Sequence, residues 1–325
     1  FFFMKFSRFF MLATVATLFS TFAGAEDYPT KTVTILVPFA AGGNTDAFAR
    51  LVGERLDQRL GQRFIVENKP GAGGNIGLGE LARAEPDGYT ISMGTVSSNA
   101  INQTLYKDLP YDKAKGFAPI SLIATLPNVL VVNPERISAK TVPELIEFLK
   151  TKPGEISYAS SGTGTSIHLA GELLATKAGV TMNHVPYKGS SQAIMDVVAG
   201  HVDMMFDNIP TAAQQVKAGK VRALAITSLE KAELLPDVPT MAETIPGFEA
   251  TSWHGLFAPA DTPPEIVEKL SREVQAIMAD PDMVAKIKGM GATPVGNTSA
   301  EFKTFIGNET TKWAEVIKAA NVPLQ

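Results

Sequence analysis

The chain lacks cysteine altogether and has few charged residues and few histidines for its length of 325 residues. Without cysteine it has no disulfide framework, no thiolate for catalysis or metal binding, and no cysteine for lipid attachment. Charged residues make up 19% of the chain and the formal net charge is −4, which argues against the basic face that nucleic acid requires. The four histidines show no metal-ligand spacing; they are His168, His184, His201 and His254. We therefore expect no cofactor, no metal and no nucleic-acid partner.

Sequence motifs of common enzymes are also missing or incomplete. No G-x-S-x-G elbow marks a hydrolase serine. Residues 71–77 are rich in glycine, but in the spacing G-x-G-x-x-G counted from Gly71 the last position is Ile76, so a dinucleotide site is not predicted. No acidic residue is paired with a base by its spacing. We therefore expect that the protein is not an enzyme.

Residues 1–25 have the three-part pattern of a cleavable secretory signal. Lys5 and Arg8 form a short basic start, residues 9–22 are apolar, and Ala25 ends a run of small residues. An apolar stretch of roughly 14 residues is too short to span a bilayer. We expect cleavage after Ala25 and export of the mature chain, most simply to a bacterial periplasm.

Short apolar runs alternate with amphipathic helical patterns along the rest of the chain. The runs expected to be strands are residues 33–37, 64–66, 89–93, 128–132, 156–158, 202–206 and 222–227. Strands that alternate with helices form parallel sheets covered by helices, so the expected fold class is α/β. The C-terminal tail is helical throughout, and its apolar stripe is expected to pack on the core.

Two segments, residues 122–132 and 250–258, are expected to pass between two lobes. This divides the mature chain into lobe 1, made of residues 26–125 and 250–325, and lobe 2, made of residues 126–249. Two crossings of this kind form a hinge that opens and closes a cleft.

The clearest functional feature is a glycine-rich segment between a buried strand and a helix, which we call loop 1 (residues 38–46). Its candidate binding residues are Phe39, Ala40, Ala41, Gly42, Gly43, Asn44, Thr45 and Asp46. The two glycines allow unusual backbone angles, and Asn44 or Thr45 is expected to cap the helix. The free N–H groups at such a helix start bind a carboxylate or phosphate without a charged side chain. The alternative is an ordinary capped turn, in which Asp46 orients its own loop.

A second segment repeats the arrangement, and we call it loop 2 (residues 160–166). Its candidate residues are Ser160, Ser161, Gly162, Thr163, Gly164, Thr165 and Ser166, with His168 on the following helix as either a cleft residue or a structural one. Ligands of open α/β sheets bind outside the carboxyl ends of the strands. Because both loops occupy that position in different lobes, we expect them to face each other across the cleft and to bind one anion.

Three further strand ends are expected as secondary contacts, with a purely structural role as an even alternative for the first two. They supply Tyr187 and Lys188, then Asp207 and Asn208, and finally Ser97 and Ser98 within the polar stretch 95–99.

In their order along the chain, several fragments resemble the tripartite tricarboxylate transporter solute receptors, the TctC or Bug family. They include VPF with GG and TD at 37–46, PGAGGNIG at 70–77, PDGY at 86–89, VPYKG at 185–189, FDN at 206–208 and LPDVPT at 235–240. The resemblance extends over essentially the whole mature chain. One departure is Ala40, at a position where proline is frequent in the family.

The resemblance implies a two-lobed periplasmic binding protein of type II, the Venus-flytrap design. It implies that loops 1 and 2 form a pincer around one carboxylate of a small organic mono- or dicarboxylate, and that a monomeric receptor delivers this ligand to membrane permease subunits. Two alternatives share the sequence features: a sensor that presents the ligand to a membrane kinase, and a periplasmic hydrolase, which would need a nucleophile–base pair.

Overall fold

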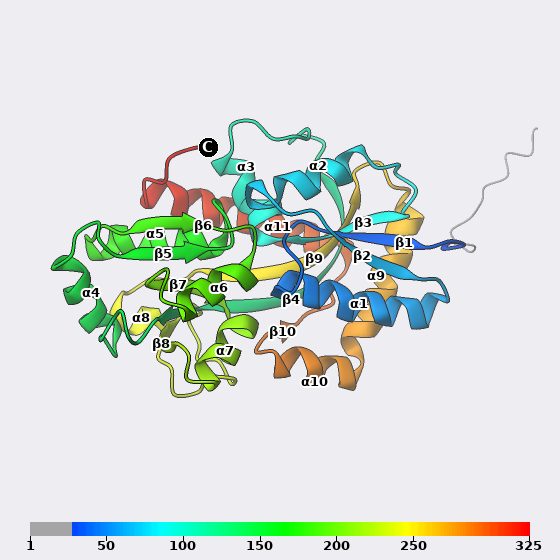
Figure 1. The fold of residues 1–325 in the computed structure, drawn as a ribbon. Coiled ribbons are helices and arrows are strands. Elements are labelled where there is room, and N and C mark those ends of the chain that lie inside the picture. The colour runs from blue at the N-terminus through cyan, green and yellow to red at the C-terminus, as the bar shows by residue number, and fades with distance from the viewer. Residues whose placement is uncertain (1–27) are drawn as a thin grey trace, which may run out of the picture.

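Residues 28–325 are described by the structure, a computed structural model, and the predicted signal peptide lies outside the described residues. The described chain forms a mixed sheet flanked by helices (Figure 1). The strands are β1 (Val33–Val37), β2 (Phe64–Asn68), β3 (Thr90–Thr95), β4 (Phe117–Val132), β5 (Ser157–Ser160), β6 (Asn183–Pro186), β7 (Met204–Asn208), β8 (Arg222–Ile226), β9 (Thr251–Pro259) and β10 (Thr293–Pro294). All the expected strands are present, and all but residues 128–132 agree within two residues at each end. That segment is the end of the much longer β4.

Helices follow most of the strands, as the sequence predicts. The helices are α1 (Asn44–Leu60), α2 (Asn75–Arg83), α3 (Asn102–Leu105), α4 (Val142–Lys150), α5 (Ser166–Ala178), α6 (Ser190–Val198), α7 (Ile209–Lys217), α8 (Met241–Thr244), α9 (Pro264–Ala279), α10 (Pro281–Gly289) and α11 (Ser299–Ala319). Helix α9, however, is followed directly by α10. The expectation that the C-terminal tail is helical throughout is wrong at β10, which lies between α10 and α11 and pairs with β4. A 3₁₀ turn, η2 (Ala72–Gly74), and a π-helical turn, η3 (Ser97–Ile101), precede α2 and α3.

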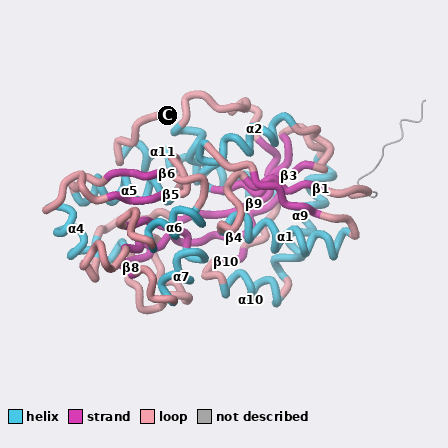
Figure 2. The backbone as a smooth tube through the Cα atoms, in the orientation of Figure 1, coloured by secondary structure: helices cyan, strands magenta, loops and turns pink. Residues whose placement is uncertain are grey.

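The order of the strands is β2-β1-β3-β9-β4-β7-β5-β6, with β8 and β10 also paired to β4. At one end β1, β2 and β3 are parallel, and at the other end β5, β6 and β7 are parallel. The central strands β9 and β4 run antiparallel to their neighbours. The expectation of parallel sheets is therefore right for the two ends and wrong for the centre. Figure 2 shows the strands running through the middle of the molecule, with helices outside them.

Strand β4 belongs to both halves of the sheet. Its first part, residues 117–127, pairs with β9, and its last part, residues 128–132, pairs with β7 and β8. Residue Ala250, directly before β9, donates its backbone N–H to the carbonyl of Thr227 beyond β8, 3.1 Å away. In Figure 1, β1–β3 and β5–β6 lie at opposite ends of the molecule, and β4 and β9 lie between them. These are the two places where the sequence predicts crossings between lobes.

The C-terminal helix α11 packs on the core through its apolar stripe. Phe302 and Trp313 are fully buried, and the indole nitrogens of Trp313 and Trp253 both donate to the Glu309 carboxylate, at 3.2 and 3.1 Å. The helix begins with a capping box formed by Thr298 and Glu301. Its stripe is therefore a packing surface, as expected from the sequence.

Candidate functional site

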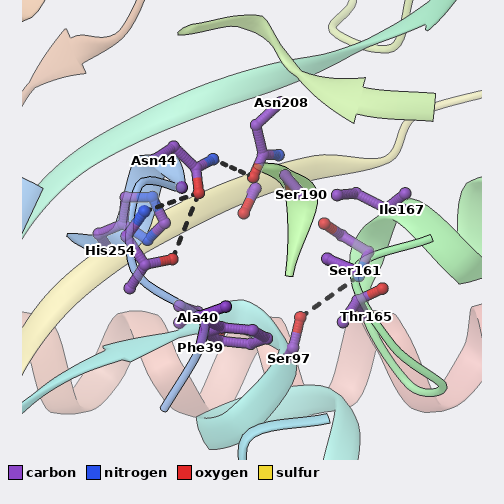
Figure 3. A pocket seen from close by; sticks show the side chains of 15 residues that line it. Phe39, Ala40, Asn44, Ser97, Ser161, Thr165, Ile167, Ser190, Asn208 and His254 are labelled. Carbon is purple, nitrogen blue, oxygen red and sulfur yellow. Dashed lines mark hydrogen bonds between the residues drawn. The ribbon is translucent and has the colours of Figure 1, made fainter. Parts of the chain in front are cut away.

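A small cavity lies between loop 1 and loop 2, at the carboxyl ends of the parallel strands. Figure 3 shows Asn44 and His254 on one side of it and Ser161 and Thr165 on the other. Its lining is Phe39, Ala40, Gly43, Asn44, Thr45, Thr95, Ser97, Ser161, Thr165, Ser166, Ile167, Ser190, Asn208, Ser252 and His254. The two loops therefore face each other across one cavity, which is the arrangement that the sequence predicts.

Loop 1 begins helix α1 without a side-chain cap. The N-cap position is Gly43, with extended backbone angles, and neither Asn44 nor Thr45 caps the helix, contrary to the prediction. The side chain of Asn44 instead accepts a hydrogen bond from the N–H of Thr45, at 2.7 Å. No described group accepts from the N–H groups of Gly43 and Asn44. These N–H groups are available to an anion at the positive end of α1.

Asp46 positions loop 1 from outside the cavity. Its carboxylate accepts two hydrogen bonds from Arg50, both 3.0 Å, one from the N–H of Gly42 at 3.1 Å and one from the amide of Asn68 at 3.0 Å. Burial alone would raise the pKa of Asp46, but these hydrogen bonds outweigh it and hold the pKa below its usual value. Asp46 is therefore ionised and neutralised by Arg50, so it orders the loop and does not repel an anion in the cavity.

Loop 2 is held by its own hydroxyl groups. Thr165 caps α5, because its Oγ1 accepts from the N–H of His168 at 3.3 Å and donates to the carbonyl of Gly162 at 2.8 Å. The N–H of Gly164 donates to His168 Nδ1 at 3.2 Å, and that of Gly162 to Ser160 Oγ at 3.1 Å. Two side chains expected to bind ligand, Ser160 and His168, thus serve the loop in this structure.

Thr165→Ala is expected to lower the free energy of unfolding by about 1 kcal/mol, the usual cost of losing a helix N-cap. It should also weaken ligand binding, because the Gly162 carbonyl loses one of its three donors, the Thr165 hydroxyl, and the shape of loop 2 is held less firmly. Thermal unfolding and calorimetry measure the two effects. Thr141→Ala is the matched control: Thr141 caps α4 in the same way and does not line the cavity, so it should cost similar stability and no affinity. Equal affinity in the two variants would contradict the role of Thr165.

Beneath loop 2 lies a stack of three rings, Tyr158, His184 and His168. The two imidazole centroids are 4.0 Å apart, and His184 Nε2 makes a 2.6 Å hydrogen bond with Ser160 Oγ. Burial, with a contribution from His184, lowers the pKa of His168 to about 3, and burial lowers that of His184 to about 4. In the unfolded chain a histidine titrates near about 6.5. Between pH 4 and 6.5 the unfolded chain therefore binds more protons, and stability falls as the pH falls.

Wild-type protein is consequently expected to lose more stability than His184→Gln when the pH is lowered from 7 to 5. The difference should be about 2 kcal/mol, because the substitution removes a group that binds a proton in the unfolded chain and not in the folded one over this pH range. Glutamine can keep a hydrogen bond to Ser160. Chemical denaturation at the two pH values measures it, and equal losses in both proteins would contradict the assignment of a neutral, buried His184.

Three asparagines form a chain across the site. Asn44 Nδ2 donates to Asn208 Oδ1, Asn208 Nδ2 donates to Asn128 Oδ1, and Asn128 Nδ2 donates to the carbonyl of Ala250 at 2.8 Å. All three side chains are buried. Strands β1 and β7 lie in opposite halves of the sheet. This series of hydrogen bonds therefore connects loop 1 to the other half of the sheet and fixes one wall of the cavity.

Other contacts also join the two halves around the cavity. The N–H of Ser166 donates to Ser97 Oγ at 3.4 Å (Figure 3), and the hydroxyl of Tyr106 donates to the carbonyl of Thr163 at 3.2 Å. The N–H of Ala40 donates to the carbonyl of Lys188 at 3.2 Å, a bond that proline at this position could not make. The structure is therefore closed over the cavity, and Ala40 contributes to the closure.

Some of the predicted residues do not line the cavity in this structure. They are Ala41, Gly42, Asp46, Ser98, Ser160, Gly162, Thr163, Gly164, His168, Tyr187, Lys188 and Asp207. Tyr187 donates to Asp196 at 2.6 Å, and Lys188 is exposed beside loop 1. Asp207 is fully buried, and burial raises its pKa to about 7 against hydrogen bonds from Thr211, Ser190 and the N–H of Asn208.

Four lining residues were not expected to bind ligand: Ile167, Ser190, Ser252 and His254, whereas Thr95 belongs to the polar stretch 95–99 that was expected to contact it. Ser252 and His254 carry a signal in the sequence, since they are two polar residues with strand spacing inside an apolar segment. Ser190 begins the helix after VPYKG, two positions beyond Lys188, the last candidate taken from that segment.

Among the residues that the structure describes, no aspartate, glutamate, lysine or arginine lines the cavity. Within residues 28–325 there is also no cluster of side chains that could hold a metal ion, and no helix there is long and apolar enough to cross a membrane. The cavity thus offers an anion main-chain N–H groups, hydroxyls, amides and one imidazole.

Comparison with known proteins places these features in a family. Residues 48–322 match the family model described as tripartite tricarboxylate transporter family receptor. Protein BugT of Bordetella pertussis is 35% identical over 93% of this chain and 93% of its own length.

Two solved structures share the fold. One, from R. palustris, was determined with adipate; it is 37% identical, with a TM-score of 0.88 over 91% of this chain and 99% of that one. The other is MatC from Rhodopseudomonas palustris with bound malate, which is 32% identical, with a TM-score of 0.85 over 89% of this chain and 100% of that one.

Proposed function

This chain belongs to the tripartite tricarboxylate transporter receptor family, and on that premise we propose that it is a periplasmic receptor for a small organic carboxylate. It captures the ligand between its two lobes without chemical change and delivers it to the permease subunits of a membrane transporter. Lobe 1 is residues 26–125 with 250–325, and lobe 2 is residues 126–249.

The observation that carries the proposal is the pair of loops around one cavity. Loop 1 presents the N–H groups of Gly43 and Asn44, and loop 2 presents Ser161 and the start of α5 from the opposite side. A carboxylate has two oxygens, so each loop can satisfy one of them. The similarity to proteins solved with adipate and malate supports a carboxylate as the ligand class.

Uncharged donors suffice for useful affinity. Hydrogen bonds to a charged group contribute about 1.5–3 kcal/mol each. Several of them, after the cost of closing the lobes, reach the roughly −8 kcal/mol of a micromolar complex. The neutral lining also releases its ligand more readily than a buried ion pair would, which suits a delivery protein.

The experiment has two parts. Mass spectrometry of small molecules released from the purified mature protein identifies the ligand class, and calorimetry with the identified compound gives its affinity. A carboxylate recovered unchanged after long incubation supports the receptor; a product of its breakdown supports a hydrolase. For delivery, uptake of the labelled compound should fall in cells that lack this protein and return with the wild-type gene.

A further inference from the structure

A buried histidine in the cavity has no hydrogen-bond partner among residues 28–325. His254 on β9 is 1% exposed, and neither Nδ1 nor Nε2 is bonded. Its ring packs on Phe48 of α1, with centroids 5.0 Å apart. Buried polar atoms in native proteins are nearly always paired, because an unpaired one carries the full cost of its desolvation. An imidazole that lines a cavity and has no protein partner is free to form a hydrogen bond with a bound ligand.

The position of His254 on the sheet places it on the floor of the cavity. Its backbone lies between Thr95 of β3 and Ala124 of β4. Ser252, two residues earlier, projects from the same face of β9 and lines the same cavity. The ring is thus held by a central strand and by Phe48 of α1, and it belongs to neither loop.

Two acidic side chains belong to elements that line the cavity, and each already has hydrogen-bond partners of its own. On α1, Asp46 is paired with Arg50, and on β7 the buried Asp207 is bonded to Thr211 and the backbone of Asn208. Burial lowers the pKa of His254 to about 3, and the backbone of Trp253 opposes this shift without forming a hydrogen bond to either nitrogen. His254 is therefore neutral in this structure, and among the described residues that line the cavity its side chain is the only one able to acquire a positive charge.

The lining also restricts the far end of the ligand. Apart from Phe39, Ala40 and Ile167, nearly all lining side chains are polar, and an apolar tail would leave the unbonded groups among them, the Ser161 hydroxyl and the His254 imidazole, without a partner. An ammonium group would find no carboxylate on the cavity wall. A second carboxylate would find the imidazole, which can meet it as a cation.

We infer that His254 is a specificity-determining residue, which binds the second carboxylate of a dicarboxylate ligand and takes up one proton from water as it does so. The proton joins the free imidazole nitrogen, and the resulting N–H group donates to the carboxylate oxygen. The inference rests on the proposed receptor function and adds to it the ligand class and a proton linkage at the site.

Calorimetry with defined probes tests it. Succinate, glutarate and adipate are each compared with their own monoamide, which has the same length and one negative charge fewer. Titrations at pH 7 in HEPES and in Tris, which differ in ionisation enthalpy, give the number of protons exchanged. The best-bound diacid should take up about one proton and its monoamide about none. The diacid should also bind at least about 10-fold more tightly, or 1.4 kcal/mol.

Substitutions test whether the proton taken up on binding joins the His254 imidazole. His254→Gln should abolish the proton uptake and reduce the preference for the diacid by about 10-fold or more. His254→Phe should do the same while retaining the packing on Phe48. His201→Gln, at an exposed histidine, is the matched control and should leave both unchanged. Thermal unfolding confirms that each variant is folded.

The outcomes separate the two proposals. Diacid binding without proton uptake, or proton uptake that persists in His254→Gln, would overturn the inference and leave the receptor function standing. If no probe binds and the molecule released from the purified protein is not a carboxylate, both the receptor function and the role of His254 are contradicted.

Discussion

Ser161→Asp is expected to reduce the affinity for a carboxylate ligand by at least about 100-fold at pH 7. Ser161 lines the cavity on the loop 2 side, is 8% exposed, and its hydroxyl makes no hydrogen bond with another described residue. The change therefore adds a negative charge without breaking an existing contact. Two like charges about 4 Å apart near a protein surface repel by about 4 kcal/mol, which exceeds the predicted loss.

The neutral variant Ser161→Asn isolates the charge. Asparagine has almost the shape of aspartate, so it should bind within about 10-fold of wild type. The affinity of the aspartate variant should also recover in acid as its carboxyl group is protonated. Calorimetry on both variants measures this, and equal losses in Asp and Asn would show that the ligand carries no negative charge at this position.

Gly73→Ala is expected to weaken binding by about 10-fold or more by preventing closure. Gly73 lies in η2, and a Cβ built there would stand 2.5 Å from the carbonyl oxygen of Thr163 in loop 2. That oxygen belongs to the backbone and cannot move without displacing loop 2. The ligand would then have to bind a partly open form and lose contacts from one side.

Gly179→Ala is the control variant for the effect of backbone strain. Gly179 has φ of 63° against 60° for Gly73, and a Cβ there meets nothing within 4 Å. Both variants should lose about 1 kcal/mol of stability from the left-handed conformation, but only Gly73→Ala should lose affinity and keep a larger radius of gyration with ligand present. Unchanged affinity and full compaction in Gly73→Ala would contradict closure through this contact.

The fold was predictable where structure is local. The buried strand at 33–37, the alternation with helices and the two glycine-rich loops depend on residues that are neighbours in the sequence. The central antiparallel pairing was not predictable in this way. It places β9 between β3 and β4, strands that lie more than a hundred residues away along the chain.

The same distinction applies to the site. Loop 1 and loop 2 were found from their own sequences, but Ser252 and His254 reach the cavity only because β9 is the central strand. The roles of Thr165 and His168 depend on hydrogen bonds that spacing alone does not reveal. A hydroxyl on a glycine-rich loop is as suited to ordering the loop as to binding a ligand, and the structure assigns the first role to Thr165.

The most direct test of the central claim is a crystal structure of the mature protein with the carboxylate that it binds. The account predicts one carboxylate group within about 3 Å of donors from both loops, including the N–H groups of loop 1 at Gly43 and Asn44 and of loop 2 around Ser161. A ligand whose carboxylate contacts only one of the loops, or lies outside this cavity, would contradict it.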